Sequence, residues 1–366
     1  MSLKNWFLSR KIIIMTGAFI GIAATVLQKL GNPANMGICV ACFERDIAGA
    51  LGFHRAAVVQ YIRPEIIGFV LGSLIAALVF KEFKPRGGSS PLIRFVLGFL
   101  AMTGSLVFLG CPWRALLRLS GGDGNALFGI AGLVAGISIG IFFIKSGYNL
   151  GRNERSRPLA SWILPSVMAG LLLLLLFRTQ LPTGVVFFSI EGPGSQHAPV
   201  LIALMIALII GFVAQRTRFC TVAAARDVLL IKDTYLFTGV VSLLIAAWIS
   251  NIILGQFNPG FQSQPVAHTN QIWNFGGMVL AGLAFTLAGG CPGRQLFLSG
   301  EGDTDAAVFV LGMIFGAGFA HNFATASSGS GPGAWGPAAV IVGLIICLFI
   351  GFSMSDLTKK KKEVSV

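Results

Sequence analysis

Long apolar runs alternate with short polar links along the whole sequence. The runs predict ten membrane-spanning helices, at roughly 11–30, 62–80, 92–110, 126–146, 159–178, 199–216, 235–256, 272–290, 305–322 and 335–355. A spanning helix needs about 20 apolar residues, and several of these runs are shorter. We therefore expect an all-α polytopic membrane protein, with helix ends defined only to within a few residues.

Four segments break this pattern, because each is too polar to cross a bilayer and too apolar for an ordinary loop. They contain "GICVACFERDI" (37–47), "GCPWRALLRLS" (110–120), "RFCTVAAARDV" (218–228) and "GCPGRQLFLS" (290–299). Proline is common at the first position of a helix, so Cys111 and Cys291, each just before a proline, are expected at or near the helix N-cap. We expect four short re-entrant helices, which a membrane protein tolerates only inside the protein or along a cavity.

The four segments form an internal repeat. Cys39 aligns with Cys220 at an offset of 181 residues, and the two Gly-Cys-Pro blocks align at an offset of 180. Five predicted spans separate the two copies, so the second copy lies inverted in the membrane, as in many transporters. We divide the chain into a first half (1–158), a connecting span and outer loop (159–198), an inverted second half (199–333), and a last span with a basic tail (334–366).

Composition supports lipid as the solvent. The sequence is 55% hydrophobic and 11% charged, whereas soluble domains carry about 25% charged residues. The net charge of +13 is spread over links between apolar runs, which argues against nucleic-acid binding. Most basic residues fall in alternate links. The positive-inside rule then predicts an inner (plasma) membrane protein with both termini in the cytoplasm.

The repeated cysteines predict a path for an anion. A helix N-terminus carries unpaired backbone N–H groups and a partial positive charge, and an arginine lies within a turn of each Gly-Cys-Pro cysteine. A soft, polarizable sulfur suits a ligand that contains sulfur or selenium. The expected substrate-path residues are Cys39, Cys111, Cys220, Cys291, Cys42, Arg114 and Arg294. Cys42 aligns with Ala223, so a packing role and a functional role stay equally open for its side chain. Cys347 is interpreted as a residue that only fills space between helices.

No pattern indicates a cofactor or a metal. The four histidines lack metal-ligand spacing and no nucleotide-binding motif occurs, so we expect no cofactor and no catalytic residue. The pair Cys39-x-x-Cys42 keeps one alternative open, a membrane enzyme that exchanges disulfides or carries a persulfide. Arg45-Asp46 and Arg226-Asp227 are interpreted as ion pairs within each half.

Several blocks together resemble the YeeE/YedE family of membrane transporters, and within it the YedE branch associated with selenium metabolism. These blocks are "GNPANMGICVACFERDIAGALGFHRAAVVQYIRPEIIG" (31–68), "KEFKPRGGSSPLIRFVLGF" (81–99), "FLGCPWRALLRLSGGDGNA" (108–126), "QRTRFC" (215–220) and "GGCPGR" (289–294). The resemblance implies an hourglass-shaped importer or channel that passes a selenium- or sulfur-containing anion along central cysteines. Here the corresponding residues are Cys39, Cys111, Cys220 and Cys291.

The resemblance leaves two further points open. Thiosulfate-type uptake with no role for selenium is the alternative substrate reading. A soluble sulfurtransferase-like or selenium-handling protein on the cytoplasmic side is the expected macromolecular partner.

Overall fold

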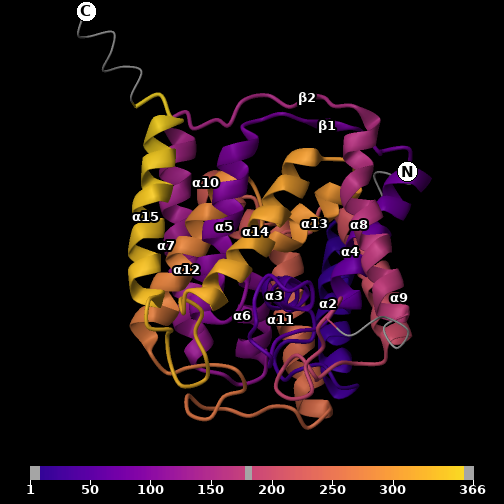
Figure 1. Ribbon diagram of the computed structural model, residues 1–366. Coiled ribbons are helices and arrows are strands. Elements are labelled where there is room, and N and C mark those ends of the chain that lie inside the picture. Colours follow the sequence, from indigo (N-terminus) through magenta and orange to yellow (C-terminus); the bar gives the residue numbers. More distant parts are fainter. Residues whose placement is uncertain (1–8, 178–183, 358–366) are drawn as a thin grey trace, which may run out of the picture.

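The computed structural model describes residues 9–177 and 184–357 as a bundle of helices, shown in Figure 1. The long helices are α2 (Arg10–Lys29), α4 (Pro64–Val79), α5 (Pro91–Phe108), α7 (Asn125–Lys145), α8 (Pro158–Leu176), α9 (Val200–Thr217), α11 (Tyr235–Ile253), α12 (Gln271–Ala288), α14 (Thr304–Asn322) and α15 (Gly336–Ser353). In the described ranges, nine apolar stretches are long enough to cross a bilayer, and α4 is a shorter apolar helix. This confirms the expected all-α polytopic membrane fold.

Four short helices complete the bundle: α3 (Val40–Ala50), α6 (Pro112–Ser120), α10 (Thr221–Ile231) and α13 (Pro292–Gly300). Each begins directly after a cysteine that occupies the N-cap position with extended backbone. Proline is the first residue of α6 and of α13, where its missing N–H costs no helical hydrogen bond. Short helices are therefore present at all four places predicted from the sequence, and their re-entrant position in the membrane stays a prediction.

Two short strands mark one end of the bundle. Strands β1 (Arg86–Gly87) and β2 (Glu154–Arg155) pair antiparallel at the top of Figure 1. We call this end the β face. The opposite end, the loop face, is formed by the loops 51–63, 254–270 and 323–335.

The helices pack as two interleaved halves. Helix α2 packs on α11 and α9 packs on α4, while α5 packs on both α14 and α12, and α12 packs on α7. Exchanging each helix for its counterpart in the other half leaves this set of neighbours unchanged, as an inverted repeat requires. Because the helices of the two halves interleave, the four-part division of the sequence marks the copies of the repeat. That its parts are separate folding units stays a prediction.

Matching glycines let the long helices approach closely. A Cβ atom on Gly132 of α7 would overlap the carbonyl oxygen of Phe275 on α12, and one on Gly312 of α14 would overlap that of Phe95 on α5. Each residue of the first contact lies 180 positions from its counterpart in the second. Small residues at these places allow the close backbone contact that drives helix association in lipid.

The orientation in the membrane and the hourglass shape stay predictions. Lys4 and the basic tail Lys359–Lys362, which support the cytoplasmic placement of both termini, lie outside the described residues. Most basic residues that the structure does describe in the links lie on the β face, so the sequence rule predicts that this face meets the cytoplasm.

Candidate functional site

Helices α3 and α6 meet at their N-termini. The Sγ atoms of Cys39 and Cys111 are 3.9 Å apart, and Cys39 Sγ accepts a hydrogen bond of 3.3 Å from the backbone N–H of Cys42. All three thiols are free and fully buried. Two helix N-termini therefore direct their unpaired N–H groups and positive dipole ends at one buried point.

Helices α10 and α13 repeat this arrangement in the second half. Cys220 Sγ accepts hydrogen bonds from the backbone N–H groups of Cys291, at 3.3 Å, and Ala223, at 3.4 Å. Both thiols of this pair are free and buried. The structure thus groups the four repeated cysteines into a first pair (Cys39 and Cys111) and a second pair (Cys220 and Cys291).

The Trp113 ring lies where α6 meets α13. A Cβ atom on Gly293 would lie 3.1 Å from Trp113 Cζ2 and 3.3 Å from Cε2, so the second residue of α6 packs directly on the second residue of α13. The ring centroids of Phe69, Phe219 and Phe297 lie 5.8, 5.7 and 6.2 Å from that of Trp113. Trp113 is fully buried, so packed aromatic rings fill the contact between α6 and α13.

The Trp113 indole also carries an unused hydrogen-bond donor. Its Nε1–H has no acceptor among the described residues. Nε1 is bonded to Cε2, the atom that faces Gly293 near the start of α13. Buried polar groups are nearly always hydrogen-bonded, so an exception at a helix N-terminus is a feature to explain.

Arg114 lies buried on the loop-face side of Trp113. Its guanidinium donates to four backbone carbonyls, those of Asn35, Leu109, Pro265 and Val266. Its Nη1 also lies 3.7 Å from Cys42 Sγ, a contact that the sequence did not predict. Within the described residues no carboxylate pairs with Arg114. Its positive charge is therefore held next to Cys42 without a counter-charge.

Arg294, the counterpart of Arg114, lies in a different environment on the β face. It forms an ion pair of 3.1 Å with Glu301 and keeps 15% of its side chain exposed. It lines a cavity of about 250 Å³, which we call the basic vestibule, together with Glu82, Arg86, Gln215, Arg216, Arg218 and Glu301. Four arginines and two glutamates give this cavity a net positive charge beside the second cysteine pair.

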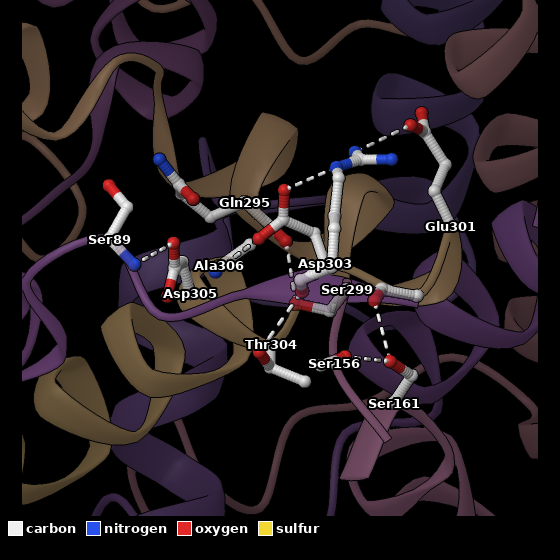
Figure 2. Close-up of polar contacts among 12 residues, drawn as sticks. Ser89, Ser156, Ser161, Gln295, Ser299, Glu301, Asp303, Thr304, Asp305 and Ala306 are labelled. Carbon is white, nitrogen blue, oxygen red and sulfur yellow. Dashed lines mark hydrogen bonds and ion pairs between the residues drawn. The ribbon is translucent and has the colours of Figure 1, made fainter. Parts of the chain in front are cut away.

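A polar network fixes the wall of the vestibule, as Figure 2 shows. Arg86 bonds to Asp303 at 2.8 Å and to Glu301 at 3.3 Å. The carboxylate of Asp305 accepts from the backbone N–H of Ser89 at 3.0 Å, and Ser161 Oγ donates to the carbonyl of Gly302 at 2.7 Å. These bonds tie the link between α13 and α14 to β1 and α8.

The predicted ion pairs are confirmed. Arg45 and Asp46 are 2.7 Å apart and buried, and Asp46 also binds Arg63 at 2.7 Å. Arg226 and Asp227 are 2.8 Å apart but keep 27% and 20% of their side chains exposed. The same dipeptide is therefore a core contact in one half and a surface contact in the other.

Two buried histidines hold the loop face. His54 Nε2 lies 3.1 Å from the carbonyl oxygen of Arg45, and His268 Nε2 lies 2.8 Å from that of Val107. Burial lowers the pKa of both imidazoles. Both rings therefore act as neutral hydrogen-bonding groups, which attach loops to the middle of α3 and to the end of α5. Among the described residues, no cluster of three or more His, Cys, Asp or Glu could hold a metal.

Glu44 is a further residue at this site that the sequence analysis did not single out. It lies on α3, fully buried, and neither carboxylate oxygen has a hydrogen-bond partner among the described residues. Its counterpart in the second half is Ala225. The sequence did contain a signal, because Glu44 is the carboxylate of this segment that is replaced by alanine in the repeat, whereas Asp46 is repeated as Asp227.

Parts of the chain match known proteins in sequence. Residues 216–351, which contain the second cysteine pair, match the family model described as sulphur transport. A segment of 103 residues is 38% identical to the thiosulfate transporter TsuA of Spirochaeta thermophila, covering 28% of this chain and 31% of that transporter. Another of 93 residues is 29% identical to an uncharacterized protein of Methanocaldococcus jannaschii, covering 22% of this chain and 89% of that protein. Residues 216–351 are therefore similar to the sulphur-transport family, and this range contains the second Gly-Cys-Pro block and nearly all of the block 215–220.

Proposed function

We propose that this protein imports a reduced sulfur anion across the membrane, past the first and second cysteine pairs. The observation that supports this most directly is the convergence of four cysteine-capped helix N-termini, in two buried pairs, on either side of Trp113. Helix N-termini bind anions through backbone N–H groups and the helix dipole, and broken helices do so at the centre of transporters.

The charges along the chain of contacts fit an anion moving from the loop face to the β face. Arg114, which pairs with no carboxylate of the described residues, adds a positive charge beside the first pair, and the basic vestibule lies beyond the second pair. Trp113 closes the route between them. Passage therefore requires the indole ring to move, which alternates access between the two pairs and limits leakage of other ions.

The chemistry of the site favours an anion with a soft terminal atom. Thiols are weak hydrogen-bond donors whose polarizable sulfur pairs well with a second sulfur, while backbone N–H groups suit oxyanion oxygens. Thiosulfate offers both kinds of atom, and the similar transporter of Spirochaeta thermophila is named for it. We further propose that the protein also takes up a selenium-containing anion of the same shape. Competition of labelled uptake by unlabelled thiosulfate, selenite and sulfate separates these substrates.

The basic vestibule also fits a soluble partner on the cytoplasmic side. Its four arginines would attract the acidic surface of a sulfurtransferase-like or selenium-handling protein that receives the anion. Such complementarity raises the association rate more than the affinity.

A membrane thiol enzyme is the second candidate, because Cys39 Sγ is 3.9 Å from Cys111 Sγ and accepts from the N–H of Cys42. Movement of the sulfur atoms by about 2 Å would allow a disulfide. An enzyme of this kind would release a chemically altered product. Chromatography of the internalised label distinguishes the two functions, because a transporter delivers its substrate unchanged.

The test of transport uses purified protein in liposomes and sulfur-radiolabelled thiosulfate. The variant Cys111→Ala/Cys291→Ala removes one thiol from each pair, and Cys347→Ala removes a buried thiol of α15 that lies outside both pairs. We expect uptake to fall about tenfold or more in the double variant, as loss of one contact to a charged ligand per pair implies. Cys347→Ala should keep the wild-type rate. Normal uptake by the double variant would contradict the proposal.

A further inference from the structure

Glu44 is a buried carboxyl group that nothing in the anion path explains. It occupies the second turn of α3, five residues after the N-cap Cys39. Its side chain is fully buried, and both oxygens lack hydrogen-bond partners among the described residues. The second half has alanine at this position, so the carboxyl group is not needed to form the short helix.

An ionised carboxylate in this position would be very costly. Moving a charge from water to an apolar site without a partner costs far more than burying a neutral polar group, and buried acids avoid the cost by holding a proton. Intramembrane acids are accordingly rare and mark ion or proton pathways. The surroundings of Glu44 thus favour the protonated, neutral acid in this closed state.

The ionisable neighbours of Glu44 leave it unpaired. On its own helix Arg45 is engaged with Asp46. Helix α6 brings the thiol of its N-cap residue Cys111 near Glu44. Glu65 of α4 accepts from Asn32.

The remaining ionisable neighbours of Glu44 are cysteines of the site and a histidine that packs on a second histidine. The ring of His321 on α14 lies 4.5 Å from the ring of His54, tilted by 33°. Cys39 is the N-cap of α3, and Cys42 lies two residues before Glu44 on the same helix. Glu44 is therefore an acid beside the first cysteine pair with no ion pair to break.

Import of an anion needs compensation that the anion path alone does not supply. An inside-negative membrane potential of about 100 mV lowers the equilibrium ratio of inner to outer concentration about 50-fold for a monoanion. For a dianion it lowers this ratio on the order of 2,000-fold. The described helices contain no nucleotide-binding loop that would supply the energy from ATP. A proton that accompanies the anion would cancel one negative charge and would add the pH gradient as a driving force.

We propose that Glu44 is the proton-binding site of the transporter, and that a proton bound there enters together with the anion. This rests on the proposed function. In the state open to the loop face, water reaches Glu44 and the carboxyl group exchanges its proton. The neutral acid then accompanies the anion at the first cysteine pair, because an ionised Glu44 would repel it. Release to the β face follows once Trp113 moves.

The test separates coupling from transport. Purified protein in liposomes is given radiolabelled thiosulfate, either with an imposed pH gradient (alkaline inside, potential clamped) or under equilibrium exchange at one pH. The variant Glu44→Gln keeps the size of the protonated acid but carries no exchangeable charge. Glu154→Gln, a change at an exposed carboxylate of β2, is the matched control. Thermal unfolding in detergent checks that each variant is folded.

We expect the pH gradient to raise wild-type and Glu154→Gln accumulation about tenfold or more. Glu44→Gln should show no response to the gradient while its exchange rate stays within about threefold of wild type. A folded Glu44→Gln protein that still accumulates with the gradient would overturn the proposal, and so would equal loss of exchange and accumulation. Failure of the transport proposal looks different, because wild-type protein would then exchange no thiosulfate at all.

Discussion

Replacing Trp113 with phenylalanine should affect stability and transport differently. The substitution keeps an aromatic ring between the cysteine pairs but removes the indole Nε1–H, which has no acceptor in the part of the chain that the structure describes. The same N–H lies near the start of α13, where the proposed path places the anion. Trp113→Phe therefore removes an N–H group that lowers the stability of the folded protein and that, in the proposed path, binds the anion during transport.

Two opposing terms set the effect on stability. The smaller ring leaves a cavity of roughly 40 Å³, which at about 24 cal/mol per Å³ costs about 1 kcal/mol. Removing an unsatisfied buried donor returns about 1–3 kcal/mol. The free energy of unfolding should thus change by at most about 2 kcal/mol and in the stabilising direction. A hydrogen bond to a charged acceptor is worth about 1.5–3 kcal/mol, so thiosulfate transport should slow roughly tenfold to hundredfold.

Both quantities are measurable on one preparation. Denaturant unfolding in mixed micelles gives the stability, and radiolabelled uptake into liposomes gives the rate. Trp248→Phe on α11, where the ring is 47% exposed, serves as the control and should alter neither. A Trp113→Phe protein that transports at the wild-type rate would refute the role of the N–H, and destabilisation by more than about 3 kcal/mol would refute the reasoning on packing.

Two further predictions compare matched positions. Gly132→Ala places a methyl group against the carbonyl oxygen of Phe275 and should lower the unfolding free energy by about 1–3 kcal/mol. At Gly170, a Cβ atom would meet no described atom within 4 Å outside its own stretch of helix α8, so Gly170→Ala should leave the unfolding free energy unchanged or raise it by up to about 1 kcal/mol. Equal effects would contradict the packing account. Asp46→Asn removes the buried partner of two arginines and should cost about 3–5 kcal/mol. Asp227→Asn, in a partly exposed pair, should lower the unfolding free energy by less than about 1 kcal/mol in the same denaturant titration. Similar decreases at both sites would show that burial does not set the cost of losing the carboxylate.

The helices were predictable because lipid makes hydropathy a strong signal. Every helix satisfies its own backbone hydrogen bonds, so a long apolar run has few other options. The observed ends of α2 through α15 lie within a few residues of the predicted runs. The short helices were predictable for a local reason, since Cys-Pro at Cys111 and Cys291 sets an N-cap and a first helical residue.

The site was only partly predictable because its contacts join segments far apart in sequence. Arg114 and Arg294 occupy identical motifs, yet the first is bonded to buried carbonyls and the second lines the vestibule. Nothing local distinguishes them. The packing of Trp113 on Gly293 likewise appears only when the two halves interlock, although the tryptophan-for-glycine difference between the two Gly-Cys-Pro-x-Arg blocks is visible in the sequence.

The most direct test of the central claim is to locate the anion itself. Selenosulfate carries a selenium atom whose anomalous scattering marks its position in crystals of the protein. The account predicts an anomalous peak at the first or second cysteine pair, next to Cys111 or Cys291, that disappears when excess thiosulfate is added. A peak confined to the protein surface, or one that survives the competing thiosulfate, would contradict a sulfur-anion path along the cysteine-capped helices.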